Sequence, residues 1–294
     1  MVDYSVVRVP QNTRKQTETN GESIHTGTVT SADGTEIAYE RSGSGPPLVL
    51  VHGGTLDRRV WELGDVRASL AEDATVYAVD RRGRGGSGDA EEYEPIREFE
   101  DIAAVVESID ESVTLLGHSS GGFYTVEAAL RTDNLAGVVL YEPAMPVTDG
   151  GFRGPSEESQ QELLSLLESG KFEQAYIDVW ENHAEWTPEE VEALRSSPLW
   201  REYAERFPTL MPKIQKIPEY EFDPERFADL TVPTLLLTGT EGPQWGEETT
   251  EAFDDALPNT SVVTFDHHGH AAMLTAPDRF VDEVLAFVRE VNDP

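Results

Sequence analysis

Short apolar runs that alternate with helical patterns are the feature that most constrains how this chain can fold. The run from Leu48 to Val51 is apolar throughout, and turn-forming residues bound it. Strands that are apolar on both faces and alternate with helices are typical of a mostly parallel sheet that helices cover on both sides. The expected fold class is therefore α/β, with a doubly wound, mostly parallel sheet of about eight strands. The other strand-like runs are Ala74 to Asp80, Ser112 to Ser119, Leu135 to Pro143, Val232 to Gly239 and Ser261 to His268, preceded by two short runs on either side of an Asp33-Gly34 turn.

One segment interrupts this alternation. Between about residues 147 and 230 no strand-like run occurs, and glutamate-rich helical stretches carry Trp180, Trp186 and Trp200. Ligands of open α/β sheets bind at the carboxyl ends of the strands, so a helical cap over that edge fits this segment. We expect most of its aromatic residues to form a small core of the insert and a minority to face a pocket. The expected organisation is a polar N-terminal tail at 1–24, a core at 25–146 and 231–294, and a helical cap insert at 147–230.

The charge balance argues against several classes of partner. With 56 acidic and 22 basic residues, the chain carries a net charge of −34, which repels phosphate backbones and anionic lipids. We therefore expect neither nucleic-acid nor membrane binding. An acid-rich, lysine-poor composition resembles that of proteins from salt-accumulating halophiles, and a merely acidic protein is the alternative. Lysine occurs only at Lys15, Lys171, Lys213 and Lys216.

Neither a membrane span nor a secretion signal is visible in the sequence. No run approaches the roughly 18 consecutive apolar residues that a span needs, and the N-terminal segment lacks the apolar centre of a signal peptide. A soluble, cytoplasmic protein is the expectation. Because the chain has no cysteine, disulfides, thiolate metal sites and a thiol nucleophile are excluded.

The stretch LLGHSSGG, from Leu115 to Gly122, contains the best candidate for a nucleophile. A serine in a sharp turn from strand to helix needs small residues two positions before and after it, where the backbone doubles back. Ser119 has glycine at both positions, whereas Ser120 would have His118 at one of them. We therefore expect Ser119 to be the nucleophile and the backbone N–H of Ser120, at the helix start, to face a developing oxyanion. A glycine-rich structural turn is the alternative.

Four stretches, in order along the chain, carry a resemblance to a known family. They are VHGGTLDRRVW, DRRGRGGSG, GHSSGG and FDHHGHAAMLTAPDRF, and with them the region from about His25 to Val291 resembles the serine-nucleophile branch of the α/β-hydrolase superfamily. The resemblance implies that the backbone N–H of Gly54 joins that of Ser120 in the oxyanion hole and that His52 braces the loop. It also implies that His270 is the catalytic base. The second stretch alone could suggest a nucleotide-binding loop, but it lacks the Lys-Ser/Thr pair of a Walker motif.

The acidic partner of the histidine departs from the family pattern. Most members carry an aspartate shortly after the penultimate strand, three residues past a glycine, and this chain has Gly242 at that place. Some members carry the acid at the end of an earlier strand, which corresponds here to Glu142. Glu241 lies one residue before the usual place. We favour Glu142, with Glu241 as the alternative.

The resemblance implies a reaction class. Dehalogenases and epoxide hydrolases of the superfamily attack with an aspartate at the elbow, whereas this chain has Ser119, so acyl transfer through a serine ester is expected. We interpret the chain as a carboxylic ester hydrolase that acts on small-molecule acyl substrates without a metal or an organic cofactor. Lactone, amide or C–C bond hydrolysis, acyl transfer and perhydrolysis use the same residues and stay alternatives, as does a ligand-binding homologue without turnover.

Overall fold

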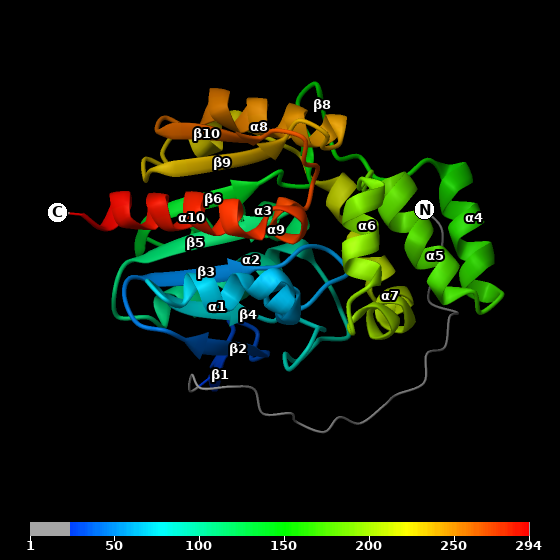
Figure 1. Ribbon diagram of the computed structural model, residues 1–294, viewed down its shortest axis with the longest axis horizontal. Helices are drawn as coiled ribbons and strands as arrows, with labels where there is room; N and C mark the ends of the chain where they lie inside the picture. The colour runs from blue at the N-terminus through cyan, green and yellow to red at the C-terminus, as the bar shows by residue number, and fades with distance from the viewer. Residues whose placement is uncertain (1–23, 294) are drawn as a thin grey trace.

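The centre of the molecule is one eight-stranded sheet, seen in a computed structural model that describes residues 24–293 (Figure 1). Its strands are β1 (His25–Thr30), β2 (Glu36–Ser42), β3 (Pro47–Val51), β4 (Thr75–Val79), β5 (Val113–His118), β6 (Leu135–Tyr141), β9 (Thr234–Gly239) and β10 (Thr260–Phe265). They lie in the order β1-β2-β4-β3-β5-β6-β9-β10. β2 is antiparallel to both of its neighbours, and the other pairings are parallel. The expected fold class and sheet are confirmed.

Helices cover both faces of the sheet because the central strands are apolar on both faces. Along β3, Leu48 and Leu50 belong to one buried cluster, and Val49 and Val51 belong to the other. This alternation follows from the two-residue period of a strand. The first cluster includes α1 (Val66–Leu70) and α10 (Pro277–Asn292); the second includes α2 (Pro95–Glu107), α3 (Ser120–Ala129) and α8 (Gln244–Ala256).

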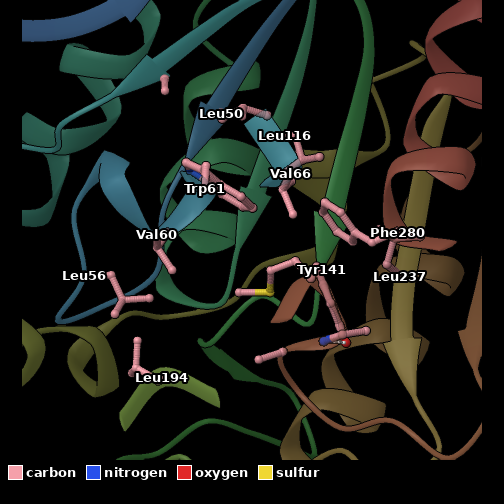
Figure 2. Close-up of a cluster of buried hydrophobic side chains, with 14 of the residues drawn as sticks. Leu50, Leu56, Val60, Trp61, Val66, Leu116, Tyr141, Leu194, Leu237 and Phe280 are labelled. Atoms are coloured by element: carbon pink, nitrogen blue, oxygen red, sulfur yellow. Dashed lines mark hydrogen bonds between the residues drawn. The ribbon is translucent and has the colours of Figure 1, made fainter. Parts of the chain in front are cut away.

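Figure 2 shows the first of these two clusters. Leu50 and Leu116 come from the neighbouring strands β3 and β5, and the Trp61 ring lies 6.3 Å from the ring of Phe280 in α10. Leu194 belongs to the same cluster, although it comes from α6 (Pro188–Arg195) in the segment predicted to be a cap. The sheet and this helical segment therefore share one continuous core.

Two local features differ from the sequence expectation. The segment RRVWELGDVRASLAE, expected to be one helix, divides into a 3-10 helix, η1 (Arg58–Asp65), and the short α1. Near the end of η1, Leu63 leaves the helical conformation and Gly64 takes a left-handed one with φ of 63°, which interrupts the helical hydrogen-bond ladder. The segment from 147 to 230 also begins with a two-residue strand pair, β7 (Pro146–Val147) with β8 (Gly150–Gly151), where no strand was expected.

Beyond β8 this segment is helical and gathers at one end of the sheet (Figure 1). The ring of Tyr176 lies within 4.9 to 5.7 Å of the rings of Trp180, Trp200 and Phe207. These four rings therefore pack together within the insert, while Phe152, Phe222 and Phe227 pack against aromatic residues of α8. Its helices are α4 (Glu157–Glu168), α5 (Phe172–Asp178), η2 (Val179–His183), α6, α7 (Trp200–Ile214), η3 (Ile217–Glu219) and η4 (Pro224–Phe227).

Asp57, a buried residue just before η1, joins the insert to the loop after β3. It accepts hydrogen bonds from the Tyr203 hydroxyl and from Arg206 Nη1, both at 2.9 Å and both from α7. Although burial opposes ionisation, Arg59 and Arg206 lower the pKa of Asp57 well below its ordinary value. The carboxylate therefore stays charged and holds α7 in a fixed position over the loop.

Within residues 24–293 no helix has the length and apolarity that a bilayer crossing requires. The predicted N-terminal tail falls almost wholly outside these described residues.

Candidate active site

Ser119 occupies a strained turn between β5 and α3. Its φ of 56° and ψ of −129° lie in a region that non-glycine residues rarely adopt, at a cost of about 1–3 kcal/mol. A Cβ on Gly117 would lie 2.7 Å from the carbonyl oxygen of Gly121, and a Cβ on Gly121 would lie 2.5 Å from that of His52. The positions two residues before and two residues after Ser119 therefore admit only glycine, which explains the glycines of the sequence motif.

His270 and Glu142 form a buried pair. Nδ1 of His270 lies 2.5 Å from Oε2 of Glu142, which follows directly after β6. The other oxygen of Glu142 accepts hydrogen bonds from the Gly239 N–H and the Thr238 hydroxyl, both at 2.8 Å. Burial raises the pKa of Glu142 to about 8 and lowers that of His270 to about 3, because it disfavours charge on each group.

The loop that carries His270 is held on several sides. The Tyr141 hydroxyl donates to the Gly269 carbonyl at 2.5 Å, and Nε2 of His118 lies 2.8 Å from the carbonyl oxygen of His270. Glu190 of α6 accepts from the Ala271 N–H at 2.5 Å. Among the described residues, Nε2 of His270 has no hydrogen-bond partner. The ring is thus fixed through its backbone and Nδ1, while Nε2 is buried and makes no hydrogen bond to Ser119 or to any other described residue.

A pocket of about 620 Å³, its open mouth included, adjoins the elbow. Gly54, Ser119 and Ser120 line it from the sheet side, and Trp180 and Phe207 line it from the insert. Among the described residues that form its wall, none is Asp, Glu, Lys or Arg. The wall is largely apolar, and the minority of insert aromatics expected to face a pocket do so.

Comparisons with known proteins identify the family of the chain. The profile of the alpha/beta hydrolase family matches residues 48–283. The chain belongs to the α/β-hydrolase family. It is 25% identical over 299 residues to 2-hydroxy-6-oxo-6-(2'-aminophenyl)hexa-2,4-dienoic acid hydrolase of Metapseudomonas resinovorans, with 96% of this chain and 97% of the relative covered.

Solved structures give the same result for this α/β-hydrolase. A crystal structure of an α/β-hydrolase from Sphaerobacter thermophilus matches with a TM-score of 0.73 and 32% identity, covering 89% of this chain and 99% of that one. An esterase from a Rhodococcus species matches with a TM-score of 0.76 and 26% identity, covering 91% and 99%. The prediction that the chain is an enzyme of this family is confirmed.

In this α/β-hydrolase the glycine at the usual acid position makes room for Glu142. A Cβ on Gly242 would lie 2.6 Å from Oε1 of Glu142, and a Cβ on Gly246 would lie 2.8 Å from its carboxyl carbon. The alternative acid, Glu241, is about half exposed, and its carboxylate lies 3.9 Å from Nδ1 of the exposed His267. The structure therefore brings Glu142, and not Glu241, together with His270.

The two residues whose N–H groups are expected to form the oxyanion hole, Gly54 and Ser120, both line the pocket. Ser120 is the first residue of α3, so its N–H has no acceptor within the helix. The carbonyl oxygen of Gly53, in the same peptide unit as the Gly54 N–H, lies 2.8 Å from Nδ1 of His52. His52 is fully buried, and its Nε2 accepts from the Arg81 N–H at 3.2 Å, so it braces the loop.

Several residues around the site were not singled out from the sequence. Glu190 and Tyr141 hold the His270 loop through contacts that join segments far apart in the chain, and no local motif indicates them. Arg81 and Arg84 stand in the DRRGRGGSG stretch, where the sequence indicated only bracing. The repeated arginine in this lysine-poor, acidic chain was the available signal.

Proposed function

We propose that this α/β-hydrolase cleaves small carboxylic esters through an acyl-enzyme on Ser119. The observation that carries the proposal is a strained elbow serine after β5 at the same end of the sheet as a buried histidine after β10. Nδ1 of this histidine is paired to Glu142, and its Nε2 has no hydrogen-bond partner among the described residues. That arrangement is what acyl transfer by a serine requires.

Acylation follows from these roles. Ser119 Oγ attacks the ester carbonyl carbon while Nε2 of His270 takes the hydroxyl proton. The carbonyl oxygen becomes an oxyanion that accepts from the N–H groups of Gly54 and Ser120. The ester C–O bond then breaks, His270 returns the proton to the leaving oxygen, and the alcohol departs. Glu142 keeps the proton on Nδ1 and stabilises the transient imidazolium.

Deacylation repeats the sequence with water as the nucleophile. His270 takes a proton from water as the water oxygen attacks the acyl carbon, and the second oxyanion uses the same N–H groups. Collapse breaks the bond to Ser119 Oγ, which regains its proton from His270. The products are the carboxylic acid and free enzyme, so no cofactor enters the balance.

The pocket favours neutral, apolar substrates. None of the described residues that line the pocket is Asp, Glu, Lys or Arg, and the insert contributes aromatic and aliphatic groups such as Trp180, Phe207 and Met211. We propose that the helices of the insert act as the cap that sets the acyl and alcohol preference. The net charge of −34 further disfavours anionic substrates by long-range repulsion.

C–C bond hydrolysis is the second candidate because of the relative from Metapseudomonas resinovorans, whose name gives a dienoic acid as substrate. A substrate carboxylate needs a cationic or polar partner when it is buried. The described wall of this pocket has no lysine or arginine and offers a carboxylate only hydroxyl groups and His183, whose pKa burial lowers, so that its neutral form is favoured. This wall favours the ester over the acid.

A substrate panel tests the proposed reaction. We expect p-nitrophenyl esters of short, neutral acyl chains to be hydrolysed, and matched hemiesters with a free acyl-chain carboxylate to be hydrolysed at least about tenfold more slowly, because burying an unpaired charge is costly. Lactones, anilides and a dienoic C–C substrate belong in the same panel. A clear preference for the dienoic acid would replace the ester proposal with C–C hydrolysis.

The composition leads to a salt prediction. We propose that the protein is adapted to high salt, because the Debye length falls from about 10 Å at 0.1 M to about 3 Å at 1 M and so screens the repulsion among acidic side chains. The melting temperature is expected to rise by at least about 5 °C between 0.1 M and 2 M KCl, a change of roughly 2 kcal/mol for a chain of this size. Chloride is chosen over sulfate, which strengthens apolar burial in any protein. An unchanged melting temperature would contradict the proposed adaptation to high salt.

A further inference from the structure

Two buried arginines lie beneath the loop that carries the expected oxyanion donor. Arg81 and Arg84 follow β4 and are 2% and 1% exposed. Buried arginine is rare unless its donors and its charge are satisfied. Both guanidinium groups therefore need hydrogen-bond acceptors and a counter-charge in their surroundings.

Their donors bind consecutive backbone carbonyls of the loop after β3. Nη1 of Arg81 lies 3.2 Å from the carbonyl oxygen of His52 and 3.2 Å from that of Gly53. Nη2 and Nε of Arg84 donate to the next carbonyl, that of Gly54, at 3.0 and 3.3 Å. The two arginines thus hold every carbonyl from His52 to Gly54.

These contacts set the direction of an N–H group. A trans peptide unit is planar, so its C=O and N–H point in opposite directions. Because Arg81 and His52 fix the carbonyl of Gly53, they also fix the N–H of Gly54 on the opposite side of that peptide plane. Arg84 fixes the following peptide unit, which prevents the loop from rotating about Gly54.

The charges of this cluster do not balance. Glu98 lies 2.6 Å from Nε of Arg81 and 3.5 Å from Nη1 of Arg84, so two cations share one carboxylate. Although burial opposes it, Arg81 and Arg84 lower the pKa of Glu98 to about 2, so the carboxylate is ionised. The neighbouring Lys213 has its own partner in Asp89 at 2.6 Å. The two guanidinium groups therefore carry one positive charge more than the carboxylate that they share, while the adjacent Arg82 pairs with two carboxylates, Asp33 and Asp101.

We propose that Arg81 and Arg84 are positioning residues of the oxyanion hole, which hold the Gly54 N–H in its donating direction. The proposal rests on the proposed function in taking the Gly54 N–H as an oxyanion donor. Preorganised donors in a water-poor site lower the free energy of the transition state more than that of the bound substrate. Two like charges buried with one counter-charge disfavour folding, and such local costs are concentrated at functional sites.

The test compares variants that remove these contacts with variants that spare them. Arg81→Gln and Arg84→Gln are each expected to lower kcat by about 10- to 100-fold with little change in KM, somewhat less than the loss of an oxyanion donor itself. Lys213→Met is the matched control, because Lys213 is a buried cation of the same region that contacts no carbonyl from His52 to Gly54. Its kcat is expected to stay within about twofold of the wild type.

A transition-state analogue separates positioning from a general loss of structure. A trifluoromethyl ketone forms a tetrahedral adduct with the serine, whereas the matched secondary alcohol binds without an adduct. The affinity of each arginine variant for the ketone is expected to fall in proportion to kcat/KM, while its affinity for the alcohol is unchanged. Equal losses for both ligands would overturn the proposal, as would wild-type ketone affinity in a folded arginine variant.

Two further variants complete the design. Nη1 of Arg81 also lies 3.1 Å from the Ser120 hydroxyl, so Ser120→Ala must keep near wild-type ketone affinity; if it reproduces the loss of Arg81→Gln, the carbonyl contacts are not responsible. Arg81→Lys retains the charge without the guanidinium fork, so its kcat and its ketone affinity are expected to lie between those of the wild type and of Arg81→Gln. It also takes the place of Arg81→Gln if the glutamine variant does not fold. If the wild type forms the ketone adduct but hydrolyses no ester, the proposed function is refuted. The ranking of the variants by ketone affinity would still test the role of Arg81 and Arg84.

Discussion

Replacing Ser119 by alanine is expected to lower kcat for a short p-nitrophenyl ester by about 10⁴-fold or more, the size of effect seen when a serine nucleophile is removed. Ser120→Ala is expected to retain most of the activity, because only the backbone N–H of Ser120 is assigned a role. The two serines are adjacent, and the elbow geometry distinguishes them, since Ser119 has the strained φ of 56° and Ser120 begins the helix.

Initial rates over a range of ester concentrations measure this pair, with melting temperatures as the check on folding. Alanine at either position removes one hydroxyl, so both variants are expected to stay folded. If Ser120→Ala were inactive and Ser119→Ala active, the assignment of the elbow would be wrong.

Replacing Glu142 by glutamine is expected to lower kcat by about 10³- to 10⁴-fold, with Glu241→Gln near wild type as the matched control. Glutamine has a similar shape, but its amide does not hold the proton on Nδ1 of His270 or stabilise the imidazolium. Glu241 lies beside His267 at the surface, so its replacement leaves the pair at 2.5 Å untouched. Similar mild losses in both variants would mean that neither residue is the acid.

The pH profile of kcat/KM gives a second readout of the same pair. The competent form has Glu142 ionised and His270 neutral with its proton on Nδ1, so activity is lost when the pair takes up one more proton as the pH falls. Burial raises the pKa of Glu142 and lowers that of His270, so the two shifts oppose each other and the extra proton belongs to the pair rather than to one residue. The acidic limb of the wild type is expected to be displaced in Glu142→Gln, in which the pair no longer exists; an unchanged profile in that variant would contradict the description of the pair.

The fold could be predicted because the informative patterns are local. Strands such as Leu48 to Val51 are apolar on both faces, and glycines at Gly117 and Gly121 mark the elbow within a few residues. Both patterns report a steric or burial requirement that acts over short distances along the chain. The break of the first helix at Gly64 was missed because the surrounding residues favour a helix.

The sequence favoured Glu142 but left Glu241 open, because the choice of acid depends on which segments meet in space. Acidic residues are common throughout this chain, so a carboxylate near any position carried little information. In the structure, Gly242 and Gly246 leave the space that the carboxylate of Glu142 occupies. A glycine at the usual acid position was thus a positive signal for an acid elsewhere, and only the packing of β6 beside β9 reveals which one.

The measurement that bears most directly on the account is the identification of the residue that an active-site fluorophosphonate modifies. Intact-mass spectrometry of the wild type is expected to show one adduct, peptide mapping is expected to place it on Ser119, and its formation is expected to abolish ester hydrolysis. Ser119→Ala is expected to gain no adduct under the same conditions. An adduct on Ser120, or full ester hydrolysis in protein whose Ser119 is quantitatively modified, would contradict the assignment of Ser119 as the nucleophile.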